Sequence, residues 1–384
     1  MRLLRVQVPE FRALKDVDIS FEPDFTPQVF PLGSLNGGGK STLLQLIFIL
    51  LSLEKPTTNS YLENITAKLK INNYGSIYDL ATITILLQHE VCVELHHKKI
   101  CLKYLYGSVK TIDQYRNKKL NDTIYFYHES FGSNISILGE LTLVDNDIKF
   151  DDNFKLIDII DDNRLCRLGE QIIKKLFLIS PSNQPYIFLQ KDERRALFTK
   201  DNKTQYDQAV KNAQANLPNF FTFDFEDVLV EVFRRARAND FKKRNKDNPF
   251  AHTEKLEADI NNLFIDGKKI ASLIIEQQRH TQDEIQGVYF KLPSGEKIYP
   301  EDLSHGELKR LAIFVLIKYH EMQDAIVLID EIENGFHPDW QYTIVRNLVE
   351  WGKNNQYILA THSYELCTAV TPAHVKELEP RLTK

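Results

Sequence analysis

The chain has 384 residues, of which 43% are hydrophobic and 26% are charged. This composition and length are typical of a globular protein with one large core or two to three domains, so a disordered or fibrous protein is excluded. The net charge of −5 excludes a surface that is basic throughout, so a nucleic-acid site would have to be a local patch. Four cysteines without zinc-site spacing, and an N-terminus without a signal peptide, predict a soluble cytoplasmic protein that does not bind membranes.

The first elements along the chain are two strands, a glycine-rich loop and a helix. Apolar and polar residues alternate over 3–8 and again over 17–21, which predicts a hairpin. A short apolar stretch then leads into the loop SLNGGGKST at 34–42, and the apolar run after this loop predicts a buried helix that ends before Pro56. Residues 77–105 return to a strand pattern and predict an antiparallel meander.

Between residue 106 and the last ninety residues, the pattern of apolar and polar residues predicts helices and strands less clearly. Residues 106–220 have a mixed composition that assigns no element, whereas 226–246 and 252–286 are expected to be helical. After a short strand at 288–292, apolar runs alternate with helical segments, which predicts a parallel sheet. We therefore expect an α/β fold with an N-terminal part of the core at 1–105, an inserted and mainly helical lobe at 106–287, and a C-terminal part of the core at 288–384.

The loop at 34–42 has the composition of a phosphate-binding loop. Small residues let consecutive backbone N–H groups converge on the phosphates of ATP, Lys40 reaches the β- and γ-phosphates, and the Ser41 hydroxyl is placed to bind Mg²⁺. Ser34 stands where the usual first glycine of this motif would be, and the alternative is a glycine-rich helix start that binds no nucleotide. The predicted nucleotide-binding residues of the loop are Asn36, Gly37, Gly38, Gly39, Lys40, Ser41 and Thr42.

Two apolar strands near the end of the chain end in polar side chains. The run AIVLIDE at 325–331 ends in Asp330, which can hold Mg²⁺ opposite Ser41, and in Glu331, which can polarise the attacking water. The run YILATHS at 357–363 carries His362 at the position where a sensor of the γ-phosphate would lie in a parallel nucleotide-binding sheet. Taken alone, each of these patterns also occurs in proteins without such a site.

The sequence LSHGE at 303–307 precedes a helical run. Ser304 and Gly306 offer a hydroxyl, an unobstructed backbone N–H and a helix dipole to an anion. The alternative is an ordinary capping box, in which Ser304 and Glu307 satisfy the first backbone groups of the helix.

These four motifs, in this order, resemble the ABC-type ATPases. The runs at 11–21 (FRALKDVDISF) and 329–338 (IDEIENGFHP) are similar to the OLD, RecF and prokaryotic-defence branch of those ATPases. The resemblance implies an ATPase head with a mixed or parallel nucleotide-binding sheet, an antiparallel β subdomain and a helical lobe. It also implies that Arg12 lies near the nucleotide and that Asn334, Gly335 and His337 lie at a dimer interface. The resemblance also implies a glutamine in a loop near the nucleotide, the Q-loop. The sequence does not identify this glutamine, and Gln88 is the candidate.

Within this branch the chain resembles the ATPases of the Septu and PARIS defence systems and of retrons. The resemblance implies an ATP-sandwiched homodimer or higher oligomer that acts as the nucleotide-dependent switch of an anti-phage complex. Only 22 residues follow His362, which are too few for a TOPRIM nuclease domain. The acidic pair Asp145 and Asp147 has the spacing D-x-D but no identifiable partner glutamate for a nuclease site. We therefore expect the effector to be a separately encoded nuclease. The alternative is a RecF-like DNA-repair ATPase that binds DNA as an ATP-dependent dimer.

One stretch of the chain is strongly basic. Contacts between such a cluster and phosphates would bind DNA or RNA without sequence preference, whereas the alternative is a solvated helix end or a protein-docking surface. The cluster comprises Arg234, Arg235, Arg237, Lys242, Lys243, Arg244 and Lys246.

Overall fold

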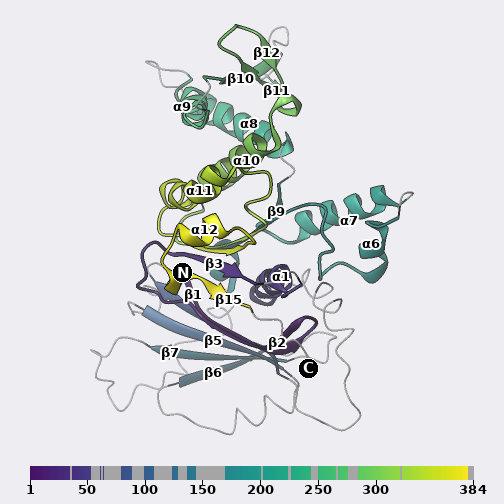
Figure 1. Cartoon of the computed structure of the whole chain (residues 1–384), viewed down its shortest axis with the longest axis vertical. Helices are drawn as coiled ribbons and strands as arrows, with labels where there is room; N and C mark the ends of the chain where they lie inside the picture. Colours follow the sequence, from purple (N-terminus) through teal and green to yellow (C-terminus); the bar gives the residue numbers. More distant parts are fainter. Residues whose placement is uncertain are drawn as a thin grey trace.

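The protein is described by a computed structural model that covers residues 1–34, 37–52, 61, 64, 79–88, 99–107, 123–128, 136–143, 169–199, 202–223, 226–243, 250–264, 267–275, 284–320 and 322–378. Within these residues the chain forms an antiparallel sheet, a parallel sheet and a smaller three-stranded sheet, together with helices (Figure 1). The expected α/β fold class is confirmed.

The antiparallel sheet contains the predicted hairpin and the predicted meander. Its order is β2-β1-β4-β5-β7-β6. The turn between the first two strands is tight, since Phe11 pairs with Leu14, and the next two strands pair antiparallel over 79–107. The bounds are β1 (Arg2–Phe11), β2 (Leu14–Ser20), β4 (Asp79–Gln88), β5 (Lys99–Gly107), β6 (Thr123–His128) and β7 (Ser136–Leu143).

The second large sheet is parallel, with the order β15-β3-β14-β13-β8-β9. Every residue of β8, β13 and β14 is buried, which explains their continuous apolar runs. Pro31 is tolerated within this sheet because β15 pairs only with Leu32 and Gly33 of β3, so no ladder bond is needed at the proline nitrogen on that side. The bounds are β3 (Val29–Gly33), β8 (Leu176–Ser180), β9 (Phe220–Thr222), β13 (Ile326–Asp330), β14 (Gln356–Ala360) and β15 (Lys376–Glu377).

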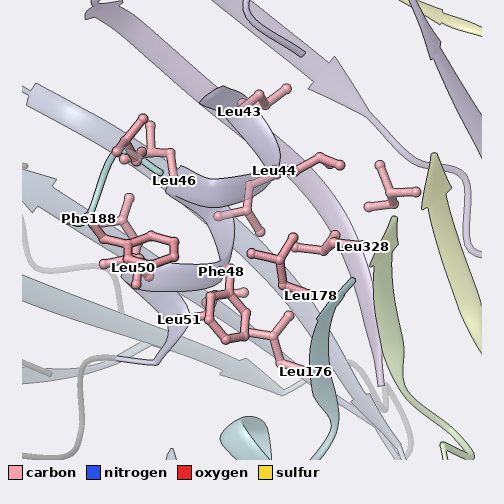
Figure 2. Close-up of a cluster of buried hydrophobic side chains, with 14 of the residues drawn as sticks. Leu43, Leu44, Leu46, Phe48, Leu50, Leu51, Leu176, Leu178, Phe188 and Leu328 are labelled. Atoms are coloured by element: carbon pink, nitrogen blue, oxygen red, sulfur yellow. The ribbon is translucent and has the colours of Figure 1, made fainter. Parts of the chain in front are cut away.

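Helix α1 (Lys40–Leu51) lies between the two large sheets. Its residues pack against Leu176, Leu178 and Leu328 of the parallel sheet, as Figure 2 shows, and the same cluster includes β1 residues. Burial from both sides explains why the helix is apolar around its whole circumference, and each fully buried Leu or Phe contributes about 1.5 to 3 kcal/mol.

The opposite face of the parallel sheet is covered by helices from the C-terminal part of the chain. The alternate strand residues, such as Phe177, Val327 and Leu359, face this side and pack against α10 and α11. Figure 1 shows these helices on the side of the sheet away from the antiparallel sheet. The bounds are α10 (His305–Tyr319), α11 (Pro338–Trp351) and α12 (Tyr364–Thr368), with 3-10 helices η3 (Pro300–Asp302) and η4 (Pro372–His374).

A lobe beyond α10 combines helices with the small sheet. The helix expected over 252–286 is wrong beyond Asn261, because the chain turns at Gly267, which has a φ of +78°, and continues as a hairpin. The side chain of Asn261 accepts a hydrogen bond from the Ile270 N–H at 2.7 Å and fixes this turn. The elements are α8 (Glu226–Lys243), α9 (Ala251–Asn261), β10 (Lys269–Ile275), β11 (Glu284–Lys291) and β12 (Lys297–Ile298).

The segment before this lobe contributes α6 (Lys191–Ala196) and α7 (Lys203–Asn216). The interval 106–287 also supplies strands to both large sheets, and the expected division of the chain at 105 and 287 stays a prediction. Among the helices that the structure describes, none combines the length and hydrophobicity that a membrane crossing requires.

Candidate nucleotide-binding site

The loops that follow β3, β13 and β14 meet at the carboxyl edge of the parallel sheet. These three strands are neighbours, so the phosphate loop, the acidic strand end and the histidine come together although they are far apart in the sequence. Lys40, Ser41, Asp330 and His362 are thus brought to one place, as expected from the sequence.

The phosphate loop leads directly into α1. Gly37 and Gly39 have φ values of 83° and 86°, a backbone conformation that a side chain would strain. A Cβ on Gly39 would lie 2.7 Å from the Leu14 side chain, so the turn between β1 and β2 packs against this loop. Lys40 Nζ donates to the Ser34 hydroxyl at 3.0 Å and to the Ser34 carbonyl at 3.2 Å, so the residue that replaces the usual glycine holds the lysine. Asn36 lies outside the described residues.

Ser41 and Asp330 connect the phosphate loop to the end of β13. The Ser41 hydroxyl donates to Asp330 Oδ1 at 3.0 Å, and Asp330 is 1% exposed. Burial raises the pKa of Asp330 to about 7, with the nearby Glu331 charge adding to the effect and the Ser41 hydrogen bond opposing it. Asp330 Oδ2 is buried and has no hydrogen-bond partner among the described residues. A hydroxyl beside a carboxylate with an unpaired oxygen is a donor set that fits Mg²⁺, whose remaining ligands would be water and phosphate oxygens.

Glu331 follows immediately and has an unusual backbone conformation. Its φ is 50°, a left-handed value that turns the chain sharply at the end of the strand. The Glu331 carboxylate is half-buried and accepts a hydrogen bond from Asn334 Nδ2 at 2.6 Å. It is therefore held at the edge of the site, one residue beyond the candidate Mg²⁺ ligand.

Lys309 is a buried cation that the sequence analysis missed. It is 3% exposed, donates to the Glu331 carbonyl and lies 4.2 Å from the centroid of the Phe223 ring. Burial lowers the pKa of Lys309 to about 8, although the acidic residues of the site oppose this. Because Lys309 is on α10, it connects that helix to the acidic end of β13.

His362 lies next to the phosphate-loop lysine. Its Nδ1 is 3.4 Å from Lys40 Nζ, and its backbone N–H donates to Glu333 Oε1 at 2.6 Å. The imidazole is exposed toward the site, whereas Thr361 and Ser363 on either side are buried. His362 therefore lies where a phosphate held by Lys40 would be within its reach.

The glutamine that reaches this site is Gln184, and Gln88 does not. Gln88 ends β4 in the antiparallel sheet, where it pairs with Lys99. Gln184 follows β8, the neighbour of β13, and its side chain acts on Asp330 by lowering the pKa of that carboxyl. Its Nε2 is buried without a hydrogen-bond partner among the described residues. The only signal in the sequence is a short apolar run, Leu176–Ser180, inside a stretch of mixed composition.

Arg12 lies in the turn that packs against the phosphate loop. It has a φ of 56°, and its Nη2 donates to the Ile187 carbonyl at 3.5 Å. Arg194 donates to the same carbonyl at 3.0 Å. Burial, with the Arg194 charge adding to it, lowers the pKa of Arg12. The structure thus places Arg12 in the turn beside the phosphate loop, together with a second arginine that the sequence did not indicate, and the expected position of Arg12 near the nucleotide stays a prediction.

The LSHGE segment lies on the other side of the parallel sheet from α1. Ser304 caps α10 in a capping box with Glu307, which is the alternative that the sequence left open. A Cβ on Gly306 would lie 2.4 Å from the Gly335 carbonyl oxygen, so this segment packs tightly against the loop after β13. Because α1 and α10 pack on opposite faces of the sheet, Ser304 is not brought to Lys40 of the same chain.

Fold and site together define the class of P-loop nucleotide-binding proteins. The sequence model of the AAA ATPase domain family matches residues 1–367, so the chain belongs to that family.

Two curated relatives are retron ATPases. The retron Vc95 probable ATPase of Vibrio cholerae serotype O1 biovar El Tor is 51% identical over 52 residues, which are 14% of this chain and 10% of that protein. The retron Ec83 probable ATPase of Escherichia coli is 42% identical over 51 residues, 13% of this chain and 9% of that protein. The chain thus matches about a tenth of the length of either relative.

Among solved structures, the chain is similar to SMC head domains. The head domain from Thermotoga maritima has a TM-score of 0.41 and 12% identity, over 96% of this chain and 92% of the other. The head domain with an extended coiled coil, bound to the C-terminal domain of ScpA, from Pyrococcus furiosus has a TM-score of 0.41 and 14% identity, over 96% and 91%.

Proposed function

We propose that this chain is an ABC-type ATPase that acts as the nucleotide-dependent switch of an anti-phage defence complex in the cytoplasm. The observation that carries the proposal is the hydrogen bond between Ser41 and Asp330, which joins the phosphate loop to the acidic strand end beside Lys40 and His362. Membership of the AAA ATPase domain family supports the ATPase part of the proposal, and the similarity to retron ATPases supports the defence part.

The residues of the site divide the work of hydrolysis. Lys40 and the loop N–H groups bind the phosphates, while Ser41 and Asp330 would hold Mg²⁺, which would supply positive charge against the negative charge of the phosphates. Glu331 accepts the proton of the attacking water, and His362 contacts the γ-phosphate. Gln184 places its side-chain amide near Asp330, where it can orient a water ligand.

The second half of the site comes from another copy of the chain. Ser304 and Gly306 lie on the opposite face of the parallel sheet from α1, so they can serve the nucleotide only if a partner chain presents them. A homodimer with ATP sandwiched between two heads satisfies this requirement through a two-fold axis. Nucleotide binding then closes the dimer, and hydrolysis opens it.

A switch of this kind needs something to control. Closed and open dimers do useful work only if they differ in affinity for a partner. The partner we propose is a separately encoded effector, a nuclease, in keeping with the defence systems that the chain resembles. Asp145 and Asp147, the acidic pair considered for a nuclease site, lie outside the described residues.

One experiment tests the ATPase and effector proposals together. The purified chain, incubated with Mg²⁺, ATP and plasmid or tRNA, is expected to hydrolyse ATP and leave the nucleic acid intact. Lys40→Ala should reduce hydrolysis by at least about a hundredfold, because the lysine carries the charge that meets the phosphates. Lys211→Ala, an exposed lysine on α7, is the control and should be unaffected. Cleavage that follows the protein and survives Lys40→Ala would show a nuclease centre in this chain.

A RecF-like role in DNA binding is the second candidate, and one observation favours it. Exposed basic residues lie on one face of α8, at Arg234, Arg235 and Lys242, while the other face is buried through Leu229 and Phe233. Positive charge on one side of a helix in an acidic protein is the pattern of a local phosphate-binding surface. Arg244 and Lys246, the end of the predicted cluster, lie outside the described residues.

Reversing these three charges tests the nucleic-acid surface. We expect Arg234→Glu, Arg235→Glu and Lys242→Glu together to weaken duplex binding and to lower the slope of log affinity against log salt by roughly 2 to 3, about one per lost phosphate contact. The control reverses Lys191, Lys203 and Lys211, which are exposed on α6 and α7. An unchanged slope would exclude this surface.

A further inference from the structure

A third carboxylate, Glu333, lies in the site although the four motifs give it no role. It is 8% exposed, which is deeper than the half-buried Glu331 two residues before it. The left-handed turn at Glu331 reverses the chain, so that Glu333 points back toward the end of β14. The Asn334 N–H donates to the Glu331 carbonyl at 3.2 Å and closes this turn, and the Phe336 N–H donates to the Glu333 carbonyl at 2.9 Å in the turn that follows.

The two oxygens of Glu333 have different surroundings. Oε1 accepts the backbone N–H of His362 at 2.6 Å, whereas Oε2 is buried without a hydrogen-bond partner among the described residues. A buried carboxylate oxygen that makes no hydrogen bond is costly, so a functional reason is expected for keeping a glutamate here.

The hydrogen bond from the His362 N–H to Glu333 follows directly after the last backbone hydrogen bonds at the end of β14. The ladder between β13 and β14 ends at Asp330 and Ala360, and the Thr361 N–H still donates to the Leu32 carbonyl at 3.3 Å. His362 is the next residue, and its N–H is satisfied by the Glu333 side chain. This hydrogen bond of 2.6 Å is part-buried and is made to a carboxylate, so Glu333 restricts where the His362 backbone can lie.

We propose that Glu333 is a positioning residue of this ATPase site, which holds the His362 backbone so that the imidazole stays beside Lys40 at the phosphate position. This inference rests on the proposed ATPase function. The residue acts through His362 and not on the nucleotide, so its contribution disappears when the imidazole is absent. The amide of glutamine can replace it, because the amide oxygen accepts the same backbone N–H.

Steady-state kinetics of variants at Glu333 and His362 test this dependence. Glu333→Ala is expected to lower kcat about tenfold or more with less than about a threefold change in KM, because only the interaction made in the transition state is lost. Glu333→Gln should keep kcat within about threefold of the parent. In a His362→Ala background, Glu333→Ala should add less than about twofold, which is the coupling expected of residues that act as a unit. Glu365→Ala, which removes the acceptor of the Ser363 hydroxyl in the same segment, is the control.

Two outcomes would overturn the inference. One is an equal loss from Glu333→Ala with and without His362, and the other is a Glu333→Gln variant as slow as Glu333→Ala. A thermal melt of each variant separates these effects from unfolding.

A second measurement needs no ATP hydrolysis. Selective ¹⁵N labelling of the 11 histidines gives a small set of amide signals, and His362→Gln identifies the one from His362. We expect this signal at the downfield edge, since a hydrogen bond to a carboxylate is short and strong, and Glu333→Gln should move it upfield. Glu365→Ala should leave it in place. A parent chain that hydrolyses no ATP would refute the proposed function, whereas a His362 signal unmoved in Glu333→Gln would refute the positioning role.

Discussion

Glu331→Gln is expected to bind ATP as the parent chain does, while its hydrolysis falls by at least about a hundredfold. The glutamine has the shape of the glutamate and can still accept the hydrogen bond from Asn334 that holds this side chain at 2.6 Å. It cannot take a proton from water, so only the chemical step is lost. The measurement is a comparison of ATP affinity, from equilibrium binding, with the steady-state rate of phosphate release.

The same variant should accumulate the closed dimer. If ATP closes the heads and hydrolysis opens them, a chain that keeps its ATP stays closed, so size-exclusion chromatography with Mg²⁺ and ATP should shift Glu331→Gln toward the dimer. Glu350→Gln removes an exposed carboxylate that pairs with Arg346 on α11, and it is expected to behave as the parent does. Hydrolysis by Glu331→Gln at the parent rate would show that another group is the general base.

The elements that the sequence predicts well are those whose pattern is local. The buried strands β13 and β14 are continuous apolar runs, and α1 is apolar on all sides because it lies between two sheets. Each of the strands also ends in a polar side chain at a short, fixed spacing. Parallel strands bring their carboxyl ends to one edge, so the meeting of Lys40, Asp330 and His362 could be anticipated from the order of the motifs alone.

The elements that the sequence misses depend on pairing between distant segments. β8 pairs with β13 although the partners, such as Leu176 and Ile326, are far apart in the sequence, and nothing local in Leu176–Ser180 distinguishes a strand beside β13 from any other short apolar run. Gln184 follows from that pairing and was missed with it. The helix expected over 252–286 is wrong beyond Asn261 for a local reason. The polar and apolar residues near Gly267 fit a helical pattern, but Gly267 has a positive φ and turns the chain.

Lys309 and Glu333 show why part of the site is invisible in the sequence. Lys309 lies near the start of α10, where a lysine is normally solvated, yet here it is 3% exposed and its ammonium lies 4.2 Å from the Phe223 ring centroid and 6.0 Å from that of Phe336. Glu333 is a glutamate in a turn, where exposure is the normal expectation. Both side chains are buried by residues from distant parts of the chain. Their roles are therefore inferred from their burial and their contacts in the structure, because the sequence motifs do not include them.

Mixing two inactive variants tests whether the site is shared between chains. Lys40→Ala removes the phosphate-loop charge, and Ser304→Arg places a bulky cation at the exposed start of α10, so each variant alone is expected to be inactive. In an equimolar mixture, half of the dimers combine both variants, and each of these has one intact pair of Lys40 and Ser304, so about a quarter of the parent activity should return. Loss of the Ser304 cap costs about 1 kcal/mol, which a thermal melt detects separately. A mixture as inactive as its components would mean that Ser304 does not complete the site of a partner chain.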